Sequence, residues 1–374
     1  MWADTRSPAQ STETTPPCKL VGERFFLAMA VLGHTAVAVT DLGRKRLPMK
    51  CMRLLQQCRF KLFTLYDGDV AMKSALVFLV PTFLVLASPV LAQQQTLLLW
   101  PNGNPEPSKI IGPEIDPTTD ANRIVSGMVT VRVTNVSHPS LAIYLTDTAR
   151  NTGAAALVFP GGGYSHLAYN IEGTEVCAWL NSIGVNCMLV KYRVPEKGHF
   201  PENVEDMEDA QQAMRITRAH AAAWHIDPNR IGVIGFSAGG HLAVALSTHP
   251  EFQGANVPPS TIDARPNFQL DIYPGALRGP DGKVDPSILP TPEVPPTFLV
   301  QAENDTTAHV ETSLVYFQAL KDAKIPAELH LFTQGGHGFG LRPTELPISH
   351  WTALAETWLH TIHILGPPGP LGRP

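Results

Sequence analysis

A serine flanked by glycines stands where a side chain could act as a nucleophile. The segment 235–239 reads Gly-Phe-Ser-Ala-Gly, with the spacing Gly-x-Ser-x-Gly. It follows the apolar run 231–236, typical of a buried strand, and leads into the run 238–248, which favours a helix. A turn this tight between strand and helix strains the serine backbone and exposes its hydroxyl. The pattern predicts Ser237 as the nucleophile of covalent catalysis, rather than as a helix cap.

A histidine near the end of the sequence could serve as the base for this serine. His337 lies in the segment 335–340, Gly-Gly-His-Gly-Phe-Gly, directly after a predicted strand at 327–332. Glycines on both sides would let the loop bring the imidazole to a hydroxyl and accept its proton. His241, one helical turn beyond the serine, is interpreted as a packing residue.

Two carboxylates follow the predicted strand 297–302 and could orient the histidine. Asp305 stands three residues after the strand and is predicted to be the acid, and Glu303 remains the alternative. The resulting chain order of serine, acid and histidine differs from the orders found in chymotrypsin-type and subtilisin-type enzymes.

Backbone N–H groups could stabilise the negative charge that such a reaction creates. Three glycines, 161–163, end the apolar run 154–160. The N–H groups of Gly162 and Gly163 are predicted to bind an oxyanion, together with that of Ala238 at the start of the helix after the serine.

Two residues that follow these glycines are candidates for contact with a substrate. They are Tyr164 and His166, and His166 has an equal alternative as a structural hydrogen-bonding residue. No Cys-x-x-Cys or Cys/His cluster predicts a metal site. Covalent catalysis by a serine, a histidine and a carboxylate also requires no metal and no organic cofactor.

The elements that must position these residues alternate between strand and helix patterns. Two early runs, 128–135 and 141–146, are predicted to form antiparallel strands around a turn at 138–139. Later strands are predicted at 154–160, 186–192, 231–236, 268–273, 297–302 and 327–332. Helices are predicted near 172–182, 204–224, 238–248, 310–323 and 350–364. This alternation predicts an α/β protein with a mostly parallel central sheet, helices on both faces and no large lid domain.

The distribution of charge argues against nucleic acid as a partner. The 374-residue chain has a net charge of −5, but residues 1–92 carry 11 Lys and Arg against 6 Asp and Glu. The remainder carries 17 against 27 and would repel a phosphate backbone.

Residues 72–92 have the pattern of a secretory signal peptide. A lysine precedes an apolar run that ends in Val-Leu-Ala, and the expected cleavage follows Ala92. Residues 1–71 are then interpreted as a disordered upstream extension that is not native to the protein. The competing interpretation is a membrane anchor at 75–92, although Pro81 and Pro89 interrupt it. The signal peptide predicts a secreted or periplasmic protein without a stable membrane partner.

The mature chain is expected to contain one catalytic domain. Residues 93–122 are predicted to be an extended lead-in, 123–366 the catalytic domain and 367–374 a tail rich in proline and glycine. Cys177 and Cys187 lie in a predicted helix and the next strand, and they are either one disulfide or two buried thiols.

From about residue 130 to 360 the sequence resembles bacterial α/β-hydrolases named acetyl xylan esterases or xylanase-associated esterases, near the carbohydrate and feruloyl esterases. The resemblance rests on TNVSHPSLAIYL, FPGGGYSHLAYNIEGTEVCAWLNSIGVNCMLVKYRVP, DPNRIGVIGFSAGGHLA and HLFTQGGHGFGL. It implies the α/β-hydrolase fold, a triad of Ser237, Asp305 and His337, and an oxyanion hole near Gly162, Gly163 and Ala238. Pro160 stands where many lipolytic relatives have histidine, which separates the chain from the hormone-sensitive-lipase type.

The resemblance implies a serine esterase that hydrolyses short-chain acyl esters. Its expected substrate is a small-molecule or polysaccharide ester, such as an acetyl group on the xylan of plant cell walls. One alternative is a serine peptidase of the prolyl-oligopeptidase type, although the sequence lacks the propeller domain of such enzymes. The other is a non-catalytic carbohydrate-binding protein that keeps the hydrolase fold.

Overall fold

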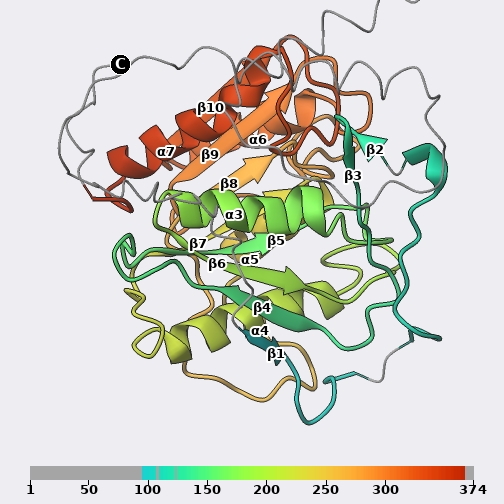
Figure 1. Cartoon of the computed structure of the whole chain (residues 1–374), viewed down its shortest axis with the longest axis vertical. Helices are drawn as coiled ribbons and strands as arrows, with labels where there is room; N and C mark the ends of the chain where they lie inside the picture. Colours follow the sequence, from blue (N-terminus) through green and yellow to red (C-terminus); the bar gives the residue numbers. More distant parts are fainter. Residues whose placement is uncertain (1–94, 107–108, 123, 367–374) are drawn as a thin grey trace, which may run out of the picture. The chain divides into compact units, whose positions relative to one another are not determined.

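An eight-stranded sheet runs through the part of the chain that the computed structural model describes, residues 95–106, 109–122 and 124–366 (Figure 1). Its strands are β1 (Gln95–Leu98), β4 (Ser140–Tyr144), β5 (Ala155–Phe159), β6 (Asn186–Lys191), β7 (Ile231–Phe236), β8 (Gln269–Ile272), β9 (Thr297–Ala302) and β10 (Ala327–Phe332). Their order is β1-β4-β6-β5-β7-β8-β9-β10. The first two pairings are antiparallel and the others are parallel. The predicted mostly parallel sheet is confirmed.

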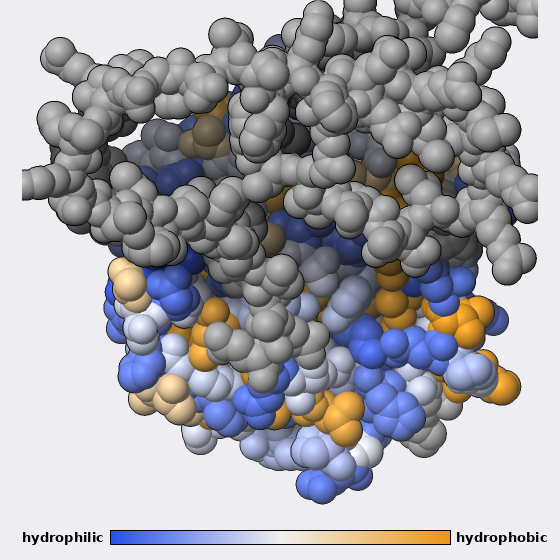
Figure 2. Space-filling view, viewed as in Figure 1, coloured by the Kyte–Doolittle hydropathy of each residue, from blue (hydrophilic) through white to orange (hydrophobic). Residues whose placement is uncertain are grey.

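Helices cover both faces of this sheet, as predicted. They are α3 (Glu175–Ser182), α4 (Glu205–His220), α5 (Ala238–Thr248), α6 (Glu311–Asp322) and α7 (Trp351–Thr361). Buried residues of α3 and α7 share one hydrophobic cluster, and those of α4, α5 and α6 share the other. Figure 1 shows α3 and α7 on the viewer's side of the sheet. On that same face, Figure 2 shows hydrophilic and hydrophobic residues intermixed where described residues are visible.

The beginning of the sheet differs from the prediction. The strand predicted at 128–135 is wrong, because only Met128–Val129 (β3) is a strand, and it pairs with Ile124–Val125 (β2) in a separate hairpin. The strand that lies beside β4 is β1, inside the segment predicted as a lead-in. Hydrogen bonds to β4 make β1 the edge strand of the sheet. The short run Gln-Thr-Leu-Leu gives no indication of this pairing.

The elements around the predicted nucleophile are buried along their whole length. Every residue of β5 and β7 is buried, as continuous apolar runs require when both faces of a parallel strand are covered. Every residue of α5 is buried as well, which is typical of a helix that is apolar on all sides. The turn between β7 and α5 is therefore held between two rigid elements.

Several predictions made from the sequence fall on residues outside the described ranges. These are the upstream extension 1–71, the signal peptide 72–92 and the tail 367–374. Within residues 95–106, 109–122 and 124–366, none of the helices combines the length and the hydropathy needed to span a bilayer.

A disulfide joins α3 to β6. Cys177 and Cys187 are bonded, with their Cα atoms 5.1 Å apart, and neither residue is exposed. Of the two interpretations that the sequence left open, the structure therefore contains the bridge. In the loop-closure account, the bridge stabilises the fold mainly because it restricts the conformational freedom of the unfolded chain.

Replacing both cysteines with alanine is expected to destabilise the protein. For a sequence separation of 10 residues, loop-closure entropy gives a loss of about 2–3 kcal/mol in the free energy of unfolding. For a domain of this size, the melting temperature should fall by roughly 5–10 °C. Differential scanning calorimetry of the oxidised wild type and the double variant measures the loss. An unchanged melting temperature would contradict a stabilising role of the bridge.

A buried ionic cluster lies beneath the end of β6. The fully buried Arg193 donates hydrogen bonds to Asp209 (Nη2 to Oδ1, 2.9 Å) and to Glu208 (3.1 Å) at the start of α4. Burial and the nearby charge of Asp209 raise the pKa of Asp206, from its ordinary 3.8 to about 7. Burial and the charge of Asp206 likewise raise the pKa of Glu196. One arginine thus faces more carboxyl groups than it can neutralise.

Stability is expected to fall as pH rises from 5 to 8, and Asp206→Asn should flatten this dependence. The unfolded chain releases the proton of Asp206 near pH 4, whereas the folded protein keeps it to about pH 7. The contribution of Asp206 to the free energy of unfolding is therefore complete at pH values below the pKa that its carboxyl group has in the unfolded chain. It is lost as pH rises from there through the pKa in the folded protein, by up to about 1.4 kcal/mol for each pH unit. Melting temperatures from pH 5 to 8 test this, with the exposed Asp322→Asn as control. Equal slopes for wild type and Asp206→Asn would disprove it.

Candidate active site

Ser237 occupies a strained turn between β7 and α5. Its backbone angles are φ 53° and ψ −117°, a conformation that L-residues rarely adopt. The positions two residues to either side of Ser237 require glycine, because other backbone atoms lie too close for a side chain. A Cβ at Gly235 would lie 2.1 Å from the carbonyl oxygen of Gly239, and one at Gly239 would lie 2.0 Å from that of Phe159. The turn that the sequence predicted is present.

Ser237, His337 and Asp305 are brought together from three loops. The Nε2 atom of His337 lies 2.9 Å from the Oγ of Ser237, and its Nδ1 lies 2.7 Å from Oδ2 of Asp305. His337 follows β10 and Asp305 follows β9, so all three loops lie at the carboxyl edge of the parallel strands. Glu303, the alternative acid, is exposed, and the carboxylate at the imidazole belongs to Asp305.

The carboxyl group of Asp305 is held ionised despite its burial. Burial alone would raise its pKa, but hydrogen bonds from His337 and from the backbone N–H groups of Thr307 and Ala308 outweigh this and lower it. A further donor is the side chain of Gln301, whose Nε2 lies 3.1 Å from Oδ2. The carboxylate therefore has a fixed orientation toward the imidazole.

Gln301 is a site residue that the sequence interpretation missed. Its amide oxygen accepts a hydrogen bond from the Oγ of Ser313 at 3.0 Å, and its Nε2 also donates to the carbonyl of Ala308. The signal was a polar residue within the mostly apolar strand β9, since buried polar groups require partners.

The peptide planes of the glycine loop are fixed by their carbonyl groups. The carbonyl of Gly161 accepts the N–H of Ala168 at 2.9 Å, and that of Gly162 accepts the N–H of Ser165 at 3.1 Å. In a trans peptide the N–H points opposite to the carbonyl, so the N–H groups of Gly162 and Gly163 point the other way. Both glycines line the same pocket as Ser237.

The N–H of Ala238 belongs to the first turn of α5, where helix geometry leaves N–H groups without an intrahelical partner. The positive end of the α5 dipole therefore lies directly beside Ser237. Together with the N–H groups of Gly162 and Gly163, this arrangement supplies donors of the kind that an oxyanion requires.

A pocket of about 370 Å³ opens in front of these groups. His166 lines it, as a contact with substrate would require, and its Nδ1 also lies 3.0 Å from the Oγ of Ser165, as the alternative structural role would require. Sequence interpretation missed eight other lining residues, which come from elements far apart in the chain. They are Val125, Thr130, Arg132, Ala168, Ile171, Glu172, Thr307 and Gly338.

Tyr164, predicted to contact substrate, is not among the residues that line this pocket. Tyr164 adopts φ 56° and turns beneath α5, where it is 6% exposed. Its hydroxyl lies 3.0 Å from the carbonyl of Ala238 and 2.8 Å from Nδ1 of His241. His241 is fully buried, and burial lowers its pKa to about 3, so it is a neutral packing residue, as the sequence indicated.

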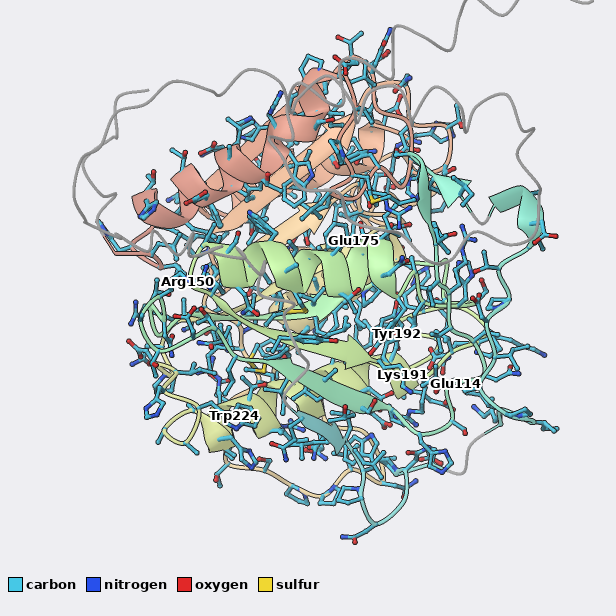
Figure 3. All side chains as sticks on the ribbon, viewed as in Figure 1. Glu114, Arg150, Glu175, Lys191, Tyr192 and Trp224 are labelled. Carbon is cyan, nitrogen blue, oxygen red and sulfur yellow. A yellow bond between two sulfur atoms is a disulfide. The ribbon has the colours of Figure 1, made fainter. Side chains whose placement is uncertain are left out.

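A buried arginine joins the wall of the pocket to the histidine loop. Arg342 follows His337 on the same loop and donates to the carbonyls of Val125 (2.8 Å) and Met128 (2.9 Å) in the β2–β3 hairpin. Its guanidinium also binds the carboxylate of Glu175 at 2.7 Å. Figure 3 shows Glu175 at the N-terminal end of α3. The hairpin that carries Val125 is thus tied to two elements of the main domain.

The fold and the arrangement of serine, histidine and carboxylate are those of the α/β-hydrolase class. Two family models match the chain: BD-FAE over residues 141–267, and the prolyl oligopeptidase family over residues 284–361. Each model contains part of the site, since the first spans Ser237 and the second spans Asp305 and His337.

Solved and curated relatives agree with this class. The crystal structure of an acetyl ester-xyloside bifunctional hydrolase from Caldicellulosiruptor lactoaceticus is 33% identical, with a TM-score of 0.57, and the match covers 75% of this chain and all of that one. An acetylxylan esterase of Xylanibacter ruminicola is 32% identical over 213 residues, which are 50% of this chain and 42% of that protein. Endo-1,4-beta-xylanase B of Butyrivibrio fibrisolvens is 29% identical over 57% of this chain and 36% of its own length.

This chain belongs to the α/β-hydrolase family. It spans less than half the length of these two curated relatives. The fold and the family that the sequence resemblance implied are confirmed.

Proposed function

We propose that this protein is a serine esterase that hydrolyses short-chain acyl esters. The observation that carries the proposal is the position of His337 Nε2, 2.9 Å from the hydroxyl of Ser237 at the edge of a pocket. The Oγ of Ser237 attacks the ester carbonyl carbon while Nε2 takes its proton. The N–H groups of Gly162, Gly163 and Ala238 bind the oxyanion that forms.

Collapse of this intermediate completes the first half of the reaction. The carbon–oxygen bond to the alcohol breaks, and His337 returns the proton to the departing alkoxide. Water then attacks the acyl-serine, His337 takes a proton from it, and breakdown releases the carboxylic acid and restores the hydroxyl of Ser237. Asp305 holds the imidazole in the tautomer that both steps require.

We propose acetyl groups on xylan as the substrate. The names of two relatives, an acetylxylan esterase and an acetyl ester-xyloside hydrolase, support this choice. The pocket of about 370 Å³ is at the small end of the range for ligand sites, which favours a short acyl group.

We also propose that the protein acts outside the cytoplasm. The signal-peptide pattern at 72–92 supports export, and so does the disulfide between Cys177 and Cys187, because such bridges persist in oxidising compartments. N-terminal sequencing of the protein recovered from the periplasm or medium should give Gln93 as the first residue. Retention of residues 1–71 would contradict export by this signal.

A substrate panel tests the proposed activity. It comprises p-nitrophenyl acetate, butyrate and octanoate, acetylated xylan and a prolyl dipeptide p-nitroanilide. Preferred cleavage of the acetate ester with release of acetate from xylan is expected. Activity on small esters alone would remove xylan from the proposal. Cleavage of only the anilide would favour a peptidase, a candidate that the prolyl oligopeptidase match over 284–361 supports.

A further inference from the structure

Glu172 is a buried carboxylate at the site that the proposed mechanism does not use. It lies in the π-helical turn η2 (Asn170–Thr174) directly before α3, lines the pocket with Ser237 and is 4% exposed. A carboxyl group removed from water is unfavourable unless hydrogen bonds replace its hydration. The partners of Glu172 therefore indicate what its position achieves.

One oxygen of Glu172 holds the loop of the predicted oxyanion hole. Its Oε2 accepts the N–H of Gly161 at 2.7 Å, and the carbonyl of Gly161 accepts the N–H of Ala168. Gly161 also packs against the nucleophile, since a Cβ there would lie 2.7 Å from the Cβ of Ser237. Glu172 thus fixes the residue from which the N–H groups of Gly162 and Gly163 extend.

The other oxygen of Glu172 reaches the histidine loop through one hydroxyl. Its Oε1 accepts the O–H of Tyr273 at 2.9 Å, and the same hydroxyl accepts the N–H of Gly340 at 3.2 Å. The ring of Tyr273 packs edge-on against the imidazole of His337, with ring centres 5.0 Å apart. The loop that carries the base is thereby joined to the carboxylate.

The turn η2 also touches the histidine loop directly. A Cβ at Gly340 would lie 2.9 Å from the carbonyl oxygen of Ile171, the residue before Glu172. The glycine loop, the end of β8 and the histidine loop therefore meet at this turn. These segments are distant in sequence. Glu172 accepts hydrogen bonds from the glycine loop and from Tyr273 at the end of β8, and Tyr273 in turn accepts one from the histidine loop.

We infer that Glu172 is a positioning residue that fixes the oxyanion loop and the histidine loop relative to each other. The N–H groups of the first loop and Nε2 on the second must reach the same reacting carbon at once, and a shift of about 1 Å in either can reduce the rate on the order of 100-fold. This inference rests on the proposed function, because it concerns how the same groups are held for acyl transfer.

The test is the rate at which Ser237 reacts with a fluorophosphonate, which needs no carboxylic ester. Oγ of Ser237 forms a bond to phosphorus, the phosphorus–fluorine bond breaks, and fluoride leaves while His337 takes the serine proton. The phosphoryl oxygen then occupies the oxyanion hole. The reaction therefore requires both loops that Glu172 is inferred to hold.

Three variants and one control separate positioning from folding. Glu172→Ala removes both links, Glu172→Gln can keep an acceptor for Gly161 and a contact to Tyr273, and Tyr273→Phe removes only the link to the histidine loop. The control is Glu114→Gln, which breaks a surface ion pair to Lys191 of 2.7 Å (Figure 3). Each variant is also assayed for kcat and KM with p-nitrophenyl acetate and for its melting temperature.

Glu172→Ala is expected to slow labelling and kcat on the order of 100-fold with little change in KM. Glu172→Gln should recover most of this loss, Tyr273→Phe should fall between them, and Glu114→Gln should match wild type. Wild-type rates in Glu172→Ala, or equal losses in Glu172→Ala and Glu172→Gln, would overturn the inference. If Glu172→Ala does not fold, a wild-type rate in folded Tyr273→Phe overturns it. Failure of the wild type to label at Ser237 would instead reject the proposed function.

Discussion

Ser237→Ala is expected to lower kcat for p-nitrophenyl acetate by roughly 10⁴- to 10⁶-fold, since removal of a catalytic serine leaves only the oxyanion hole and binding to act. The hydroxyl is the atom to which the acyl group becomes attached, so no neighbouring group replaces it. Ser237 stands directly before α5 and its side chain makes no hydrogen bond to the helix end, so loss of its hydroxyl should leave the fold intact. KM is expected to change little, because most of the pocket wall remains.

The measurement combines steady-state kinetics with mass spectrometry after fluorophosphonate treatment. Wild type should gain one adduct on the peptide that contains Ser237, and Ser237→Ala should gain none. Ser260→Ala, a substitution in an exposed loop, is the matched control and should keep wild-type activity. If Ser237→Ala kept more than about one hundredth of the activity, the nucleophile would be a different residue.

Asp305→Asn is expected to reduce kcat by about 10⁴-fold while the protein stays folded. Asparagine can fill the same space but presents an N–H group where the carboxylate accepts the Nδ1–H of His337. The imidazole would then turn to the tautomer that carries its proton on Nε2, which cannot accept the proton of Ser237. The 2.7 Å contact between Asp305 and His337 makes this effect direct.

Glu303→Gln provides the matched control for the carboxylate. Glu303 lies two residues before Asp305 but is exposed, so its substitution should leave kcat within about twofold of wild type. A large loss with Glu303→Gln and a small one with Asp305→Asn would reverse the assignment. The pKa of Asp305 is lowered, so its carboxylate remains ionised at every pH above about 4, and its titration should not shape the activity profile there.

Local sequence patterns were sufficient for the strands and helices that surround the site. The runs at 154–160 and 231–236 are continuous and apolar because both faces of β5 and β7 are covered. The segment 128–135 differs, because beyond β3 its residues form only isolated bridges, from Val133 to Leu167 and from Thr134 to Ile115. An alternating pattern of apolar and polar residues indicates an extended segment, but it does not identify the strand or loop that lies beside that segment.

Some of the site residues could likewise be predicted from local sequence, and others could not. Ser237 and His337 were predictable because glycines next to them in sequence create the turn and the loop that each needs. The direction of the Tyr164 side chain depends on its positive φ, which a single sequence does not reveal. Glu172, Gln301 and Arg342 act through partners more than ten residues away or on other elements, so only the folded chain brings out their roles.

The attachment of the β2–β3 hairpin through Arg342 has a practical consequence for enzyme engineering. The hairpin contributes Val125 to the pocket, yet its strands are only two residues long, and one guanidinium binds three of its carbonyl groups. None of the hydrogen bonds that join Ser237, His337 and Asp305 involves this hairpin. This wall of the pocket is therefore a module that can be redesigned separately from the three residues Ser237, His337 and Asp305. A library that varies the hairpin for longer acyl chains should keep Arg342 and Glu175 constant as its anchor.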